Sequence, residues 1–390
     1  MRLGIYSDLV YRADADVLST HQAFIRFVTA LVAHVDEIVL FGRLDPQPGR
    51  SHYPLPSERV RFVPLPHYPA VTALGGQARA LRGTLRAFAA ELPRLDAVWI
   101  FGPHPMAVAL ALAARRRRTT LFLGVRQDYP EYIRNRLPGP AWGWTIPVAH
   151  ALELVFRRLA RDAPTVVLGD ELARKYRASG ARAVLSTGFS LIGAGELASR
   201  EEALARNWDG ELEVLTVGRL AREKNPLLLP EIVRELRAHG GRWRLVVVGD
   251  GPLAAALVRR AEELGVSAAM ELAGYVPSGP ALASLYRRSH VFLHVSLTEG
   301  LPQVLWEAQA AGLPVVATDV GGVRGALGGG SGLLVPPGDA GAAARALARI
   351  RDDPALRTAL VEQGLDNAAA ETTEAQLARI AAFFRAARER

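Results

Sequence analysis

The sequence predicts an α/β protein of two domains, each with a parallel sheet between helices. Short apolar runs alternate with helical stretches along both halves of the chain, which is typical of repeated strand–helix units. The 390 residues, 49% of them hydrophobic, provide for two domains with a substantial core in each. A polar, glycine-containing junction at 188–210 separates the halves. We therefore expect domains at 1–190 and 211–370, a linker at 191–210 and a final helical segment at 371–390.

Apolar runs and helical periodicity alternate through the first domain. The predicted strands are Leu3–Ser7, Glu37–Phe41, Val60–Val63, Ala97–Ile100, Thr120–Val125, Thr165–Leu168 and Ala183–Leu185. The predicted helices are Thr20–His34, Ala78–Glu91, Met106–Arg116, Trp142–Arg161 and Glu171–Ser179. The segment 45–57, rich in Pro, Ser and Gly, is predicted to be a loop.

Polar side chains follow three of these strands. Asp8 comes after the first strand, His104 lies between two prolines after the fourth, and Arg126 and Asp128 follow the fifth. Ligands of α/β proteins bind at the carboxyl ends of parallel strands, so these four residues are candidates for ligand contact. A hydrogen-bonded loop histidine explains His104 equally well.

No metal site is predicted. Asp14 and Asp16 form an Asp-x-Asp pair in the expected first loop, but no further acid or histidine obviously converges on it. A solvated loop is the favoured interpretation of this pair. The absence of cysteine excludes disulfides, thiolate nucleophiles and cysteine-ligated zinc.

The net charge of +8 is spread over interspersed arginines and forms no basic tail, so no nucleic-acid partner is expected. The longest basic run, Arg115–Arg118, ends an apolar helix, where the helix dipole favours cations. Contact with anionic lipid is the alternative interpretation of that run. No apolar stretch reaches membrane-spanning length, and the first residues lead directly into a strand. We expect a cytoplasmic protein, with association at the inner membrane face as the alternative.

The second domain has a clearer pattern. Its predicted strands are Val214–Val217, Leu245–Val248, Met270–Ala273, Val291–Val295 and Val315–Thr318. Its predicted helices are 225–239, one ending at Gly265, 281–289, 302–311, and a helical region from 340 to the end. Glycine with a polar residue follows several of these strands, as in Gly249-Asp250-Gly251, which alone is only a weak sign of a site.

The stretch 296–318 (SLTEGLPQVLWEAQAAGLPVVAT) is the most informative part of the chain. It predicts a loop, a helix whose N-terminus faces the carboxyl edge of the sheet, and a strand. Glu299 lies in the loop, and Glu307 lies about a turn and a half into the helix. Free N–H groups at Gly300 and Leu301 would hold a phosphate, and the carboxylates would accept hydrogen bonds from hydroxyls. Considered singly, each glutamate is better explained by the helix dipole or by solvation.

Arg219 and Lys224 lie between a strand end and the start of a helix, five residues apart. Only Lys175 and Lys224 are lysines among the 47 basic residues. An arginine fork and a lysine point charge at this spacing are suited to one diphosphate. A salt-bridged surface pair with the neighbouring Glu223 is an equally good explanation of the two in isolation.

These motifs together resemble a known family. GRL followed by EKN, then VVVGDGP, then VFLHVS leading to EGLPQVLWEAQAAGLPVVAT, is similar to the retaining glycosyltransferases of family four. Their signature is a glutamate, seven residues and a second glutamate, here Glu299 and Glu307. The resemblance is dense from Glu213 to Pro337 and only architectural over 1–190. It implies the GT-B fold, with two Rossmann-like α/β/α domains facing across a cleft and a final helix that packs back across both.

The resemblance also implies a mechanism and its residues. Arg219 and Lys224 would hold the diphosphate of a nucleoside-diphosphate sugar, and Glu307 would bind its ribose. Glu299 would act by position and charge on the sugar, without forming a covalent bond. The implied donor-binding residues are Gly218, Arg219, Lys224, Gly249, Asp250, Tyr275, Val276, Glu299, Gly300, Leu301, Pro302 and Glu307. No cofactor or metal is implied.

The acceptor would be held by the first domain, with Asp8, His104, Arg126 and Asp128 as candidates. It would be a glycan, a lipid-linked molecule or a small molecule. Two departures from the family pattern fall in this domain: DLVYRADADV stands where many members have a Gly-Gly pair, and Arg126-Gln127-Asp128 stands where many have a histidine. The alternatives are a nucleotide-sugar epimerase or phosphorylase of the same architecture, or a binding module that has lost catalysis.

Overall fold

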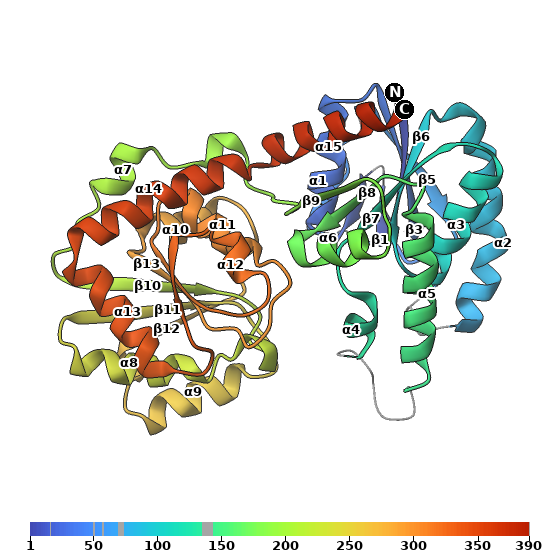
Figure 1. The fold of residues 1–390 in the computed structure, drawn as a ribbon. Helices are drawn as coiled ribbons and strands as arrows, with labels where there is room; N and C mark the ends of the chain where they lie inside the picture. The colour runs from blue at the N-terminus through green and yellow to red at the C-terminus, as the bar shows by residue number, and fades with distance from the viewer. Residues whose placement is uncertain (16, 50, 57, 69–73, 135–142, 390) are drawn as a thin grey trace. The chain divides into compact units, whose positions relative to one another are not determined.

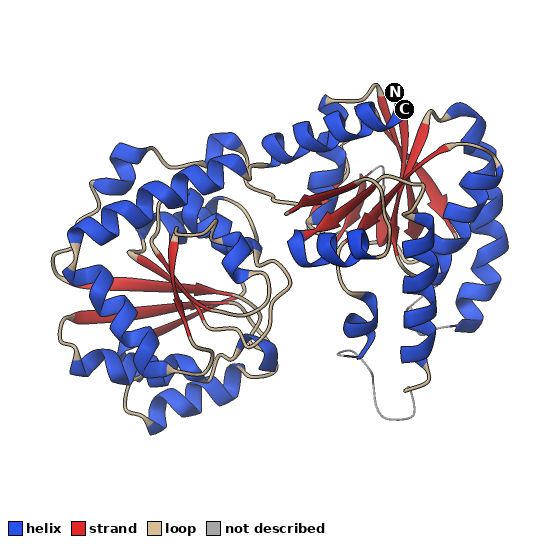
Figure 2. Cartoon of the chain, in the orientation of Figure 1, coloured by secondary structure: helices blue, strands red, loops and turns tan. Residues whose placement is uncertain are grey.

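The computed structural model describes residues 1–389 apart from 16, 50, 57, 69–73 and 135–142. Its internal contacts divide the chain into two units. The first is Met1–Leu191 together with Gln376–Arg390, and the second is Ile192–Ala375. In each unit a mostly parallel sheet lies between layers of helices (Figures 1 and 2). All but the first residue of the segment 191–210 belongs to the second unit.

Among its described residues, the first unit contains nine strands in one sheet. The strands are β1 (Arg2–Asp14), β2 (Val17–Thr20), β3 (Glu37–Leu44), β4 (Tyr53–Pro54), β5 (Val60–Leu65), β6 (Ala97–Gly102), β7 (Thr120–Val125), β8 (Thr165–Leu168) and β9 (Val184–Thr187). The helices are α1 (Phe24–Ala30), α2 (Leu74–Glu91), α3 (Pro105–Arg116), α4 (Tyr129–Arg134), α5 (Thr145–Leu159), α6 (Gly169–Ala178) and most of α15 (Thr373–Arg388).

Strand β1 lies at the centre of this sheet, between β3 and β6, and pairs with both in parallel. The prediction that it ends at Ser7 is wrong, because its register shifts after Tyr6 and the strand continues to Asp14, where it forms an antiparallel hairpin with β2. Asp8 and Asp14 therefore lie within the strand and not in a loop after it. The cause is the apolar sequence beyond Ser7, since Leu9 and Tyr11 are fully buried and continue the core.

The same hairpin corrects the first helix. Helix α1 begins at Phe24 and not at Thr20, because Val17–Thr20 pairs with β1 as a strand. The predicted loop 45–57 contains the short strand β4, which pairs with β2. The remaining predicted strands of this unit are confirmed within three residues at each end.

Helices cover both faces of the first sheet. Buried residues of α2, α3, α5 and α6 pack against one face, which includes Val98, Ile100 and Leu123. Residues of α1 and α15 pack against the other face, which includes Trp99 and Phe122. The alternation of buried side chains between faces along β6 and β7 follows from the two-residue period of a strand.

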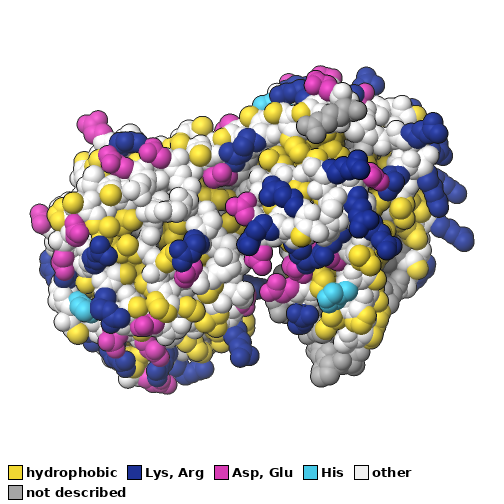
Figure 3. Space-filling view, in the orientation of Figure 1, with side chains coloured by type: hydrophobic (Ala, Val, Ile, Leu, Met, Phe, Trp, Pro, Cys, Tyr) yellow, Lys and Arg dark blue, Asp and Glu magenta, His cyan; other side chains and the backbone are white. Residues whose placement is uncertain are grey.

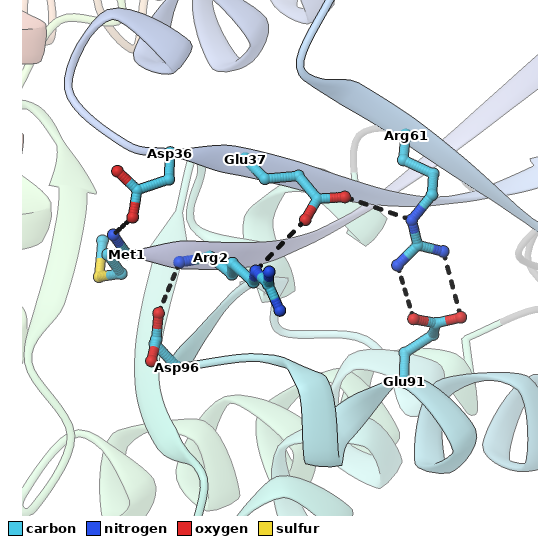
Figure 4. A network of polar contacts seen from close by, with 7 residues as sticks. All are labelled: Met1, Arg2, Asp36, Glu37, Arg61, Glu91 and Asp96. Carbon is cyan, nitrogen blue, oxygen red and sulfur yellow. Dashed lines mark hydrogen bonds and ion pairs between the residues drawn. The ribbon is translucent and has the colours of Figure 1, made fainter.

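Charged side chains hold together the amino ends of the first strands (Figure 4). The amino group of Met1 pairs with Asp36, and the backbone N–H of Arg2 donates to Asp96 at 2.6 Å. Arg61 on β5 binds the carboxylate of Glu91 on α2 with two N–H groups, at 2.6 and 3.1 Å. These contacts lie at the edge of the sheet opposite to the carboxyl ends of its strands, so they belong to the scaffold and not to a ligand site.

The chain returns to the first unit in α15. Leu377, Ile380, Ala381 and Phe384 are spaced to form one helical face, and all four are buried in the first unit's core. The Phe384 ring stacks on Phe122, with 3.9 Å between the ring centroids. The last helix is therefore a structural part of the unit formed by the chain's first half.

The second unit contains a six-stranded sheet. Its strands are β10 (Glu211–Val217), β11 (Arg242–Val248), β12 (Met270–Gly274), β13 (Val291–His294), β14 (Val315–Thr318) and β15 (Gly332–Val335). Its helices are α7 (Arg200–Leu204), α8 (Leu228–Ala238), α9 (Ala254–Glu263), α10 (Pro280–Arg288), α11 (Gln303–Ala310), α12 (Val323–Ala326), α13 (Ala340–Asp352) and α14 (Pro354–Ala370). No helix among the described residues of the chain has the length and apolar character needed to cross a bilayer.

All pairs in this sheet are parallel, in the order β12-β11-β10-β13-β14-β15. The five predicted strands and the helix following Pro302 are confirmed. The sequence analysis missed β15, which follows the glycine run Gly328–Gly330. The order of strands reverses between β10 and β13, because the chain builds outward from β10 on one side and then continues on the other. Ligands of open α/β sheets bind in the crevice at such a reversal.

The stacked ring of Phe384 supplies a test of the role of α15. Replacing Phe384 with Ala should lower the free energy of unfolding by about 3–5 kcal/mol, because a buried aromatic ring leaves a cavity behind. Urea unfolding followed by circular dichroism measures the change. Arg385→Ala, at the next and exposed position, is the control and should change stability by less than about 0.5 kcal/mol. Equal stability of both variants would show that α15 does not support the first unit's core.

Candidate active site

The loops after β10, β11 and β13 form the candidate site of the second unit. These loops meet at the carboxyl edge of the sheet, next to the reversal of strand order. Backbone hydrogen bonds join the first two of them: Gly218 N–H donates to Val248 at 2.9 Å, and Leu220 N–H donates to Asp250 at 2.9 Å. The loop after β12 joins as well, since Gly249 N–H donates to Gly274 at 2.7 Å.

Glycines allow these loops to approach one another. Gly249 has φ +138°, and a Cβ there would lie 1.9 Å from the carbonyl oxygen of Gly218. A Cβ on Gly322 would lie 1.9 Å from the carbonyl oxygen of Gly300, although the backbone of Gly322 has an ordinary conformation. Only glycine fits at these positions without moving the neighbouring loop. The glycines after β11 and β14 therefore fix the loops that carry Arg219 and Glu299.

Glu299 is the centre of a buried polar cluster. Its Oε1 accepts a hydrogen bond from Ser296 Oγ at 2.7 Å and forms an ion pair with Lys224. His294 Nε2 lies 3.0 Å from the same oxygen. The Glu299 side chain is only 9% exposed, and His294 and Ser296 are almost fully buried. Residues from two neighbouring parts of the sheet edge, the loop after β10 and the end of β13 with its loop, thus converge on one carboxylate oxygen.

This environment keeps Glu299 ionised. Burial alone would raise its pKa, but the contact with His294 and the charge of Lys224 outweigh burial and lower the pKa to about 2. All the polar contacts described above are made by Oε1. The Glu299 carboxylate is therefore fixed in orientation and charged at neutral pH, which suits an electrostatic and positioning role.

Arg219 lies beside this cluster and is far more exposed. Its guanidinium forms an ion pair with Glu223, and 62% of the arginine side chain is accessible to solvent. This is the surface pair that the sequence analysis considered as the alternative to a phosphate ligand. An exposed pair of this kind contributes little, typically about 0–1 kcal/mol, so Arg219 remains available to an incoming anion. A small hollow of about 20 Å³, the size of one water, lies between β13 and the loop that carries both Arg219 and Lys224.

Glu307 lies in the second turn of α11 and has a different environment. Its Oε2 accepts a hydrogen bond from the hydroxyl of Tyr286 on α10 at 2.8 Å. Burial raises the pKa of Glu307, while the bond from Tyr286 acts in the opposite direction. The expectation of a solvated helix glutamate is wrong, because α10 packs over this face of α11.

The N-terminus of α11 completes this group of loops. Pro302 is the N-cap residue, and its own side chain makes no capping hydrogen bond. Gly300 is exposed and Leu301 is half-buried, so the backbone before the helix borders solvent. Across the sheet edge, Tyr275 is 61% exposed, and the neighbouring Val276 packs against the core. Asp250 is exposed and accepts a hydrogen bond from Gly251 N–H at 2.7 Å, which stabilises its own turn.

In the first unit, Asp8 and His104 occupy neighbouring positions at the carboxyl edge of the sheet. Asp8 forms an ion pair with Arg43 at 2.8 Å and accepts a hydrogen bond from the Tyr68 hydroxyl at 2.6 Å. His104 caps α3 through Nδ1, which accepts from Ala107 N–H at 3.4 Å. Burial lowers the pKa of His104, although the nearby Asp8 charge acts to raise it. His104 is therefore neutral at neutral pH, and both residues have structural contacts.

Arg126 and Asp128 contact different parts of the first unit. The Arg126 guanidinium lies 3.8 Å from the centroid of the Phe24 ring, and burial lowers its pKa to about 10. Asp128 forms an ion pair with Lys175 and accepts a hydrogen bond from Glu131 N–H at 3.2 Å. Asp128 and Lys175 line a hollow of about 520 Å³ next to α4, α5 and α6. The four first-unit candidates thus do not form one cluster.

Among the described residues, no group of three or more His, Asp or Glu side chains is arranged to hold a metal ion. Asp16, the second member of the Asp-x-Asp pair, lies outside the described residues. Asp14 lies in β1, where its register partner is Val17.

Comparison with known proteins identifies the family. The model of the glycosyl transferases group 1 family matches residues 200–366, which contain all of the second-unit loops described above. A GDP-mannose-dependent alpha-mannosyltransferase of Mycobacterium tuberculosis (strain CDC 1551 / Oshkosh) is 32% identical over 292 residues, which span 72% of this chain and 70% of the relative. The chain belongs to the glycosyl transferases group 1 family. It is a glycosyltransferase that takes its sugar from a nucleotide sugar.

Solved structures extend the similarity to the whole glycosyltransferase. Sucrose-phosphate synthase from Thermosynechococcus elongatus has a TM-score of 0.69 at 19% identity, covering 99% of this chain and 98% of that one. Anabaena HepE in complex with UDP has a TM-score of 0.68 at 14% identity, covering 99% of this chain and 100% of that one. At these identities the similarity concerns the fold alone, which is GT-B.

The sequence analysis did not select several residues that contact Glu299, Glu307 or Gly300 in the candidate site. His294 and Ser296 contact Glu299, Tyr286 holds Glu307, and Gly322 fixes the backbone at Gly300. The sequence contained a signal for two of these residues, His294 and Ser296. His294 and Ser296 are polar residues at the end of an apolar strand, directly before the Glu299 loop, and such positions face the site in a parallel sheet.

The pKa of Glu299 generates a stability prediction. A carboxyl with a pKa of 4.5 when unfolded and about 2 when folded stabilises the protein above pH 4.5, and this contribution decreases as the pH falls towards 2. The unfolding free energy of the wild type relative to Glu299→Gln should therefore fall by about 2 kcal/mol between pH 4.5 and 3. Urea unfolding at a series of pH values measures the difference.

A surface pair provides the control for this experiment. Glu271 pairs with Arg244 on the outside of the same sheet, and both side chains are more than a third exposed. The difference between wild type and Glu271→Gln should stay nearly constant over the same pH range. A constant difference for Glu299→Gln as well would mean that Glu299 is not held as a carboxylate.

Proposed function

We propose that the protein is a retaining, metal-independent glycosyltransferase that binds a nucleoside-diphosphate sugar at the carboxyl edge of the second unit's sheet. The observation that carries this proposal is the Glu299 cluster. It combines a fixed carboxylate, a lysine ammonium and the N-terminus of α11 within one set of loops. Such a set offers cationic and N–H groups to a diphosphate and a carboxylate to sugar hydroxyls.

Lys224 and Arg219 are proposed to hold the diphosphate. An ammonium group has three donors, so Lys224 can keep its contact with Glu299 and donate another hydrogen to a phosphate oxygen. Arg219 would exchange its exposed partner Glu223 for a phosphate, which its planar fork can bind with two N–H groups. The N–H groups around Gly300 would add to the same anion site.

The remaining donor contacts follow from the neighbouring loops. Tyr286 occupies one oxygen of Glu307, which leaves the other for the ribose hydroxyls. The exposed ring of Tyr275 offers a surface for the base, with Val276, Gly249 and Asp250 on the adjoining loops.

The chemistry is an exchange of one bond at the anomeric carbon. The bond from that carbon to the diphosphate oxygen breaks, the acceptor hydroxyl oxygen forms the new bond on the same face, and the hydroxyl proton passes to the leaving diphosphate. Negative charge develops on the leaving group, where Lys224 and Arg219 would stabilise it without a metal. Glu299, with a pKa near 2, is a weak nucleophile, and its fixed charge instead favours positive charge developing on the sugar.

The acceptor is proposed to be held by the first unit, at the carboxyl ends of its strands. Asp8 and His104 are already held by Arg43, Tyr68 and the α3 N-terminus, so they would shape the site. Arg126 and Asp128 are the candidates for direct contact with acceptor hydroxyls. The acceptor is proposed to be a glycan, a lipid-linked molecule or a small molecule that presents a hydroxyl group.

The first experiment identifies the donor. Thermal shift with GDP, UDP and ADP and their sugars should give stabilisation by one nucleotide class, since a ligand at a hundred times its dissociation constant stabilises by about 2.7 kcal/mol. GDP-mannose and UDP-glucose are tested first, because a relative's name specifies GDP-mannose and HepE was solved with UDP-glucose. Lys224→Ala should weaken donor binding and lower turnover, each by about tenfold to a hundredfold.

A matched pair of glycines tests the backbone part of the site. Gly322→Ala would push against the Gly300 carbonyl and should weaken donor binding. Gly325→Ala, three residues later and with open space around it, should leave binding unchanged. Asp128→Ala should lower transfer while leaving nucleotide binding intact. Loss of nucleotide binding in Asp128→Ala, with Lys224→Ala unaffected, would assign the donor to the first unit.

The retaining and metal-independent parts of the proposal have their own test. Transfer should continue at an unchanged rate in excess EDTA, because the proposed diphosphate partners are cationic side chains and N–H groups. Proton NMR of the first product formed should show the same anomeric configuration as the donor sugar. Activity abolished by EDTA and restored by Mg²⁺ or Mn²⁺ would contradict metal independence, and an inverted product would contradict retention.

A further inference from the structure

The outer face of α5 exposes an apolar stripe. Val148 and Leu154 are 45% and 52% exposed, and Trp144, at the N-cap position, is 49% exposed. Pro147 and Ala151 are also exposed and fall on the same side of the helix. Single exposed apolar residues are common on proteins, but a helix face formed almost entirely of them indicates an interaction surface.

The opposite face of α5 is fixed in the core. Ala149, Glu153, Phe156 and Leu159 are buried, and Phe156 is fully enclosed against the first sheet. The helix already buries one face in the core, so a rotation that buried the exposed stripe would expose Phe156 and Leu159 instead. On the adjacent helix α3, Leu112 is 43% exposed and adds to the apolar area.

Arginines surround this stripe. Helices α2 and α3 lie next to each other in the layer that contains α5, on the same face of the first sheet. The exposed arginines of this layer are Arg79, Arg82 and Arg86 on α2, Arg115–Arg118 at the end of α3, and Arg158 and Arg161 at the end of α5. In Figure 3, Lys and Arg side chains gather over the α2 and α3 side of this unit, with hydrophobic side chains over α5.

Few acids lie on α2, α3 and α5 themselves, although Asp128 and Glu131 line the hollow that Leu154 borders on the side of α4. The segments 74–91, 105–118 and 145–162 contain only three acidic residues. Glu153 is buried, Glu91 binds Arg61, and Asp162 pairs with Arg115. The outer surface of the α2, α3 and α5 layer, which we term the α5 face, is thus basic and apolar at once.

We propose that the α5 face docks on a lipid bilayer that contains anionic headgroups. Arginines close to such a surface are attracted by its negative potential, while Trp, Leu and Val side chains enter the boundary between headgroups and acyl chains. Arginine side chains suit this position because their apolar stems can lie along the boundary with the guanidinium at the headgroups. The face explains Arg115–Arg118 better than the helix dipole alone, because the dipole accounts for neither the α2 arginines nor the apolar stripe.

Nucleic acid would also attract the arginines, but the apolar stripe contributes nothing to binding a phosphate backbone. The combination of both features is what selects the bilayer. The proposal is independent of the donor site, since every residue of the α5 face lies in the first unit and the donor residues lie in the second. Donor binding and vesicle binding can therefore fail separately.

Co-sedimentation of the full chain with vesicles tests the proposal. Binding to phosphatidylcholine vesicles that contain phosphatidylglycerol should be at least about tenfold tighter than binding to pure phosphatidylcholine, and it should weaken as salt is added. Equal binding to both kinds of vesicle, or no binding to either, would overturn the proposal.

Two variants separate the apolar and basic contributions. Val148→Glu with Leu154→Glu should reduce binding to the anionic vesicles about tenfold or more, because the stripe can no longer enter the boundary. The triple variant Arg116→Gln, Arg117→Gln and Arg118→Gln should reduce it by a similar factor and weaken its salt dependence. All five positions are exposed, so the variants should keep the wild-type melting temperature.

Matched controls lie in the second unit. Val258→Glu with Leu272→Glu replaces apolar residues that are 42% and 38% exposed, and it should leave vesicle binding within about twofold of the wild type. Arg237→Gln, Arg259→Gln and Arg287→Gln form the charge control. If the arginine triple variant weakens binding and the α5 apolar variant does not, the surface is only electrostatic and the proposal is wrong. Tight binding of duplex DNA or RNA in the absence of vesicle binding would assign the face to nucleic acid instead.

Discussion

The close approach of bare backbone segments is the constraint on which the candidate site depends. Two pairs of loops, Gly249 with Gly218 and Gly322 with Gly300, are too close to admit a side chain between them. These contacts hold the loops after β10 and β13, and a hydrogen bond from Leu297 N–H to the carbonyl of Glu223 at 2.8 Å joins those two loops to each other. The carboxylate of Glu299 is the group on which the polar cluster of these loops converges. Its ionisation is thus a product of backbone geometry as much as of the charges around it.

The two lysines of this arginine-rich chain have the same kind of surroundings. Lys224 binds Glu299 in the second unit, and Lys175 binds Asp128 in the first, with Glu153 3.8 Å away. An ammonium group is compact and has three donors in a tetrahedral arrangement, while a guanidinium is flat and wide. A lysine can therefore serve a carboxylate in a confined space and retain a hydrogen for another partner. Lysine occurs in this chain only where that property is used.

The sequence allowed most of the fold to be predicted, because glycine and proline bound nearly every apolar run of the second unit. The failures share one cause, which is that long-range pairing overrides local pattern. Strand β1 continues past Ser7 because Leu9 and Tyr11 enter the core and β2 pairs with the end of the strand, and the alternation of apolar residues near Ser7 does not reveal that partner. In the site, Glu299 and Lys224 were found from motifs. The contact of Glu299 with His294, and that of Glu307 with Tyr286 on α10, depend on how strands and helices are placed next to one another, which spacing along the chain does not specify.

Because most of α15 belongs to the first unit, the two units are completed at different times during synthesis. The second unit is one continuous stretch of chain, so all of it is made before Gln376. Most of the first unit is made earlier, yet its core lacks Leu377, Ile380 and Phe384 until α15 has left the ribosome. The half of the protein that is synthesised first is therefore the half that completes its folding last. Until then, the surface around Trp99 and Phe122 stays open to water, or to any chaperone that recognises exposed aromatic side chains.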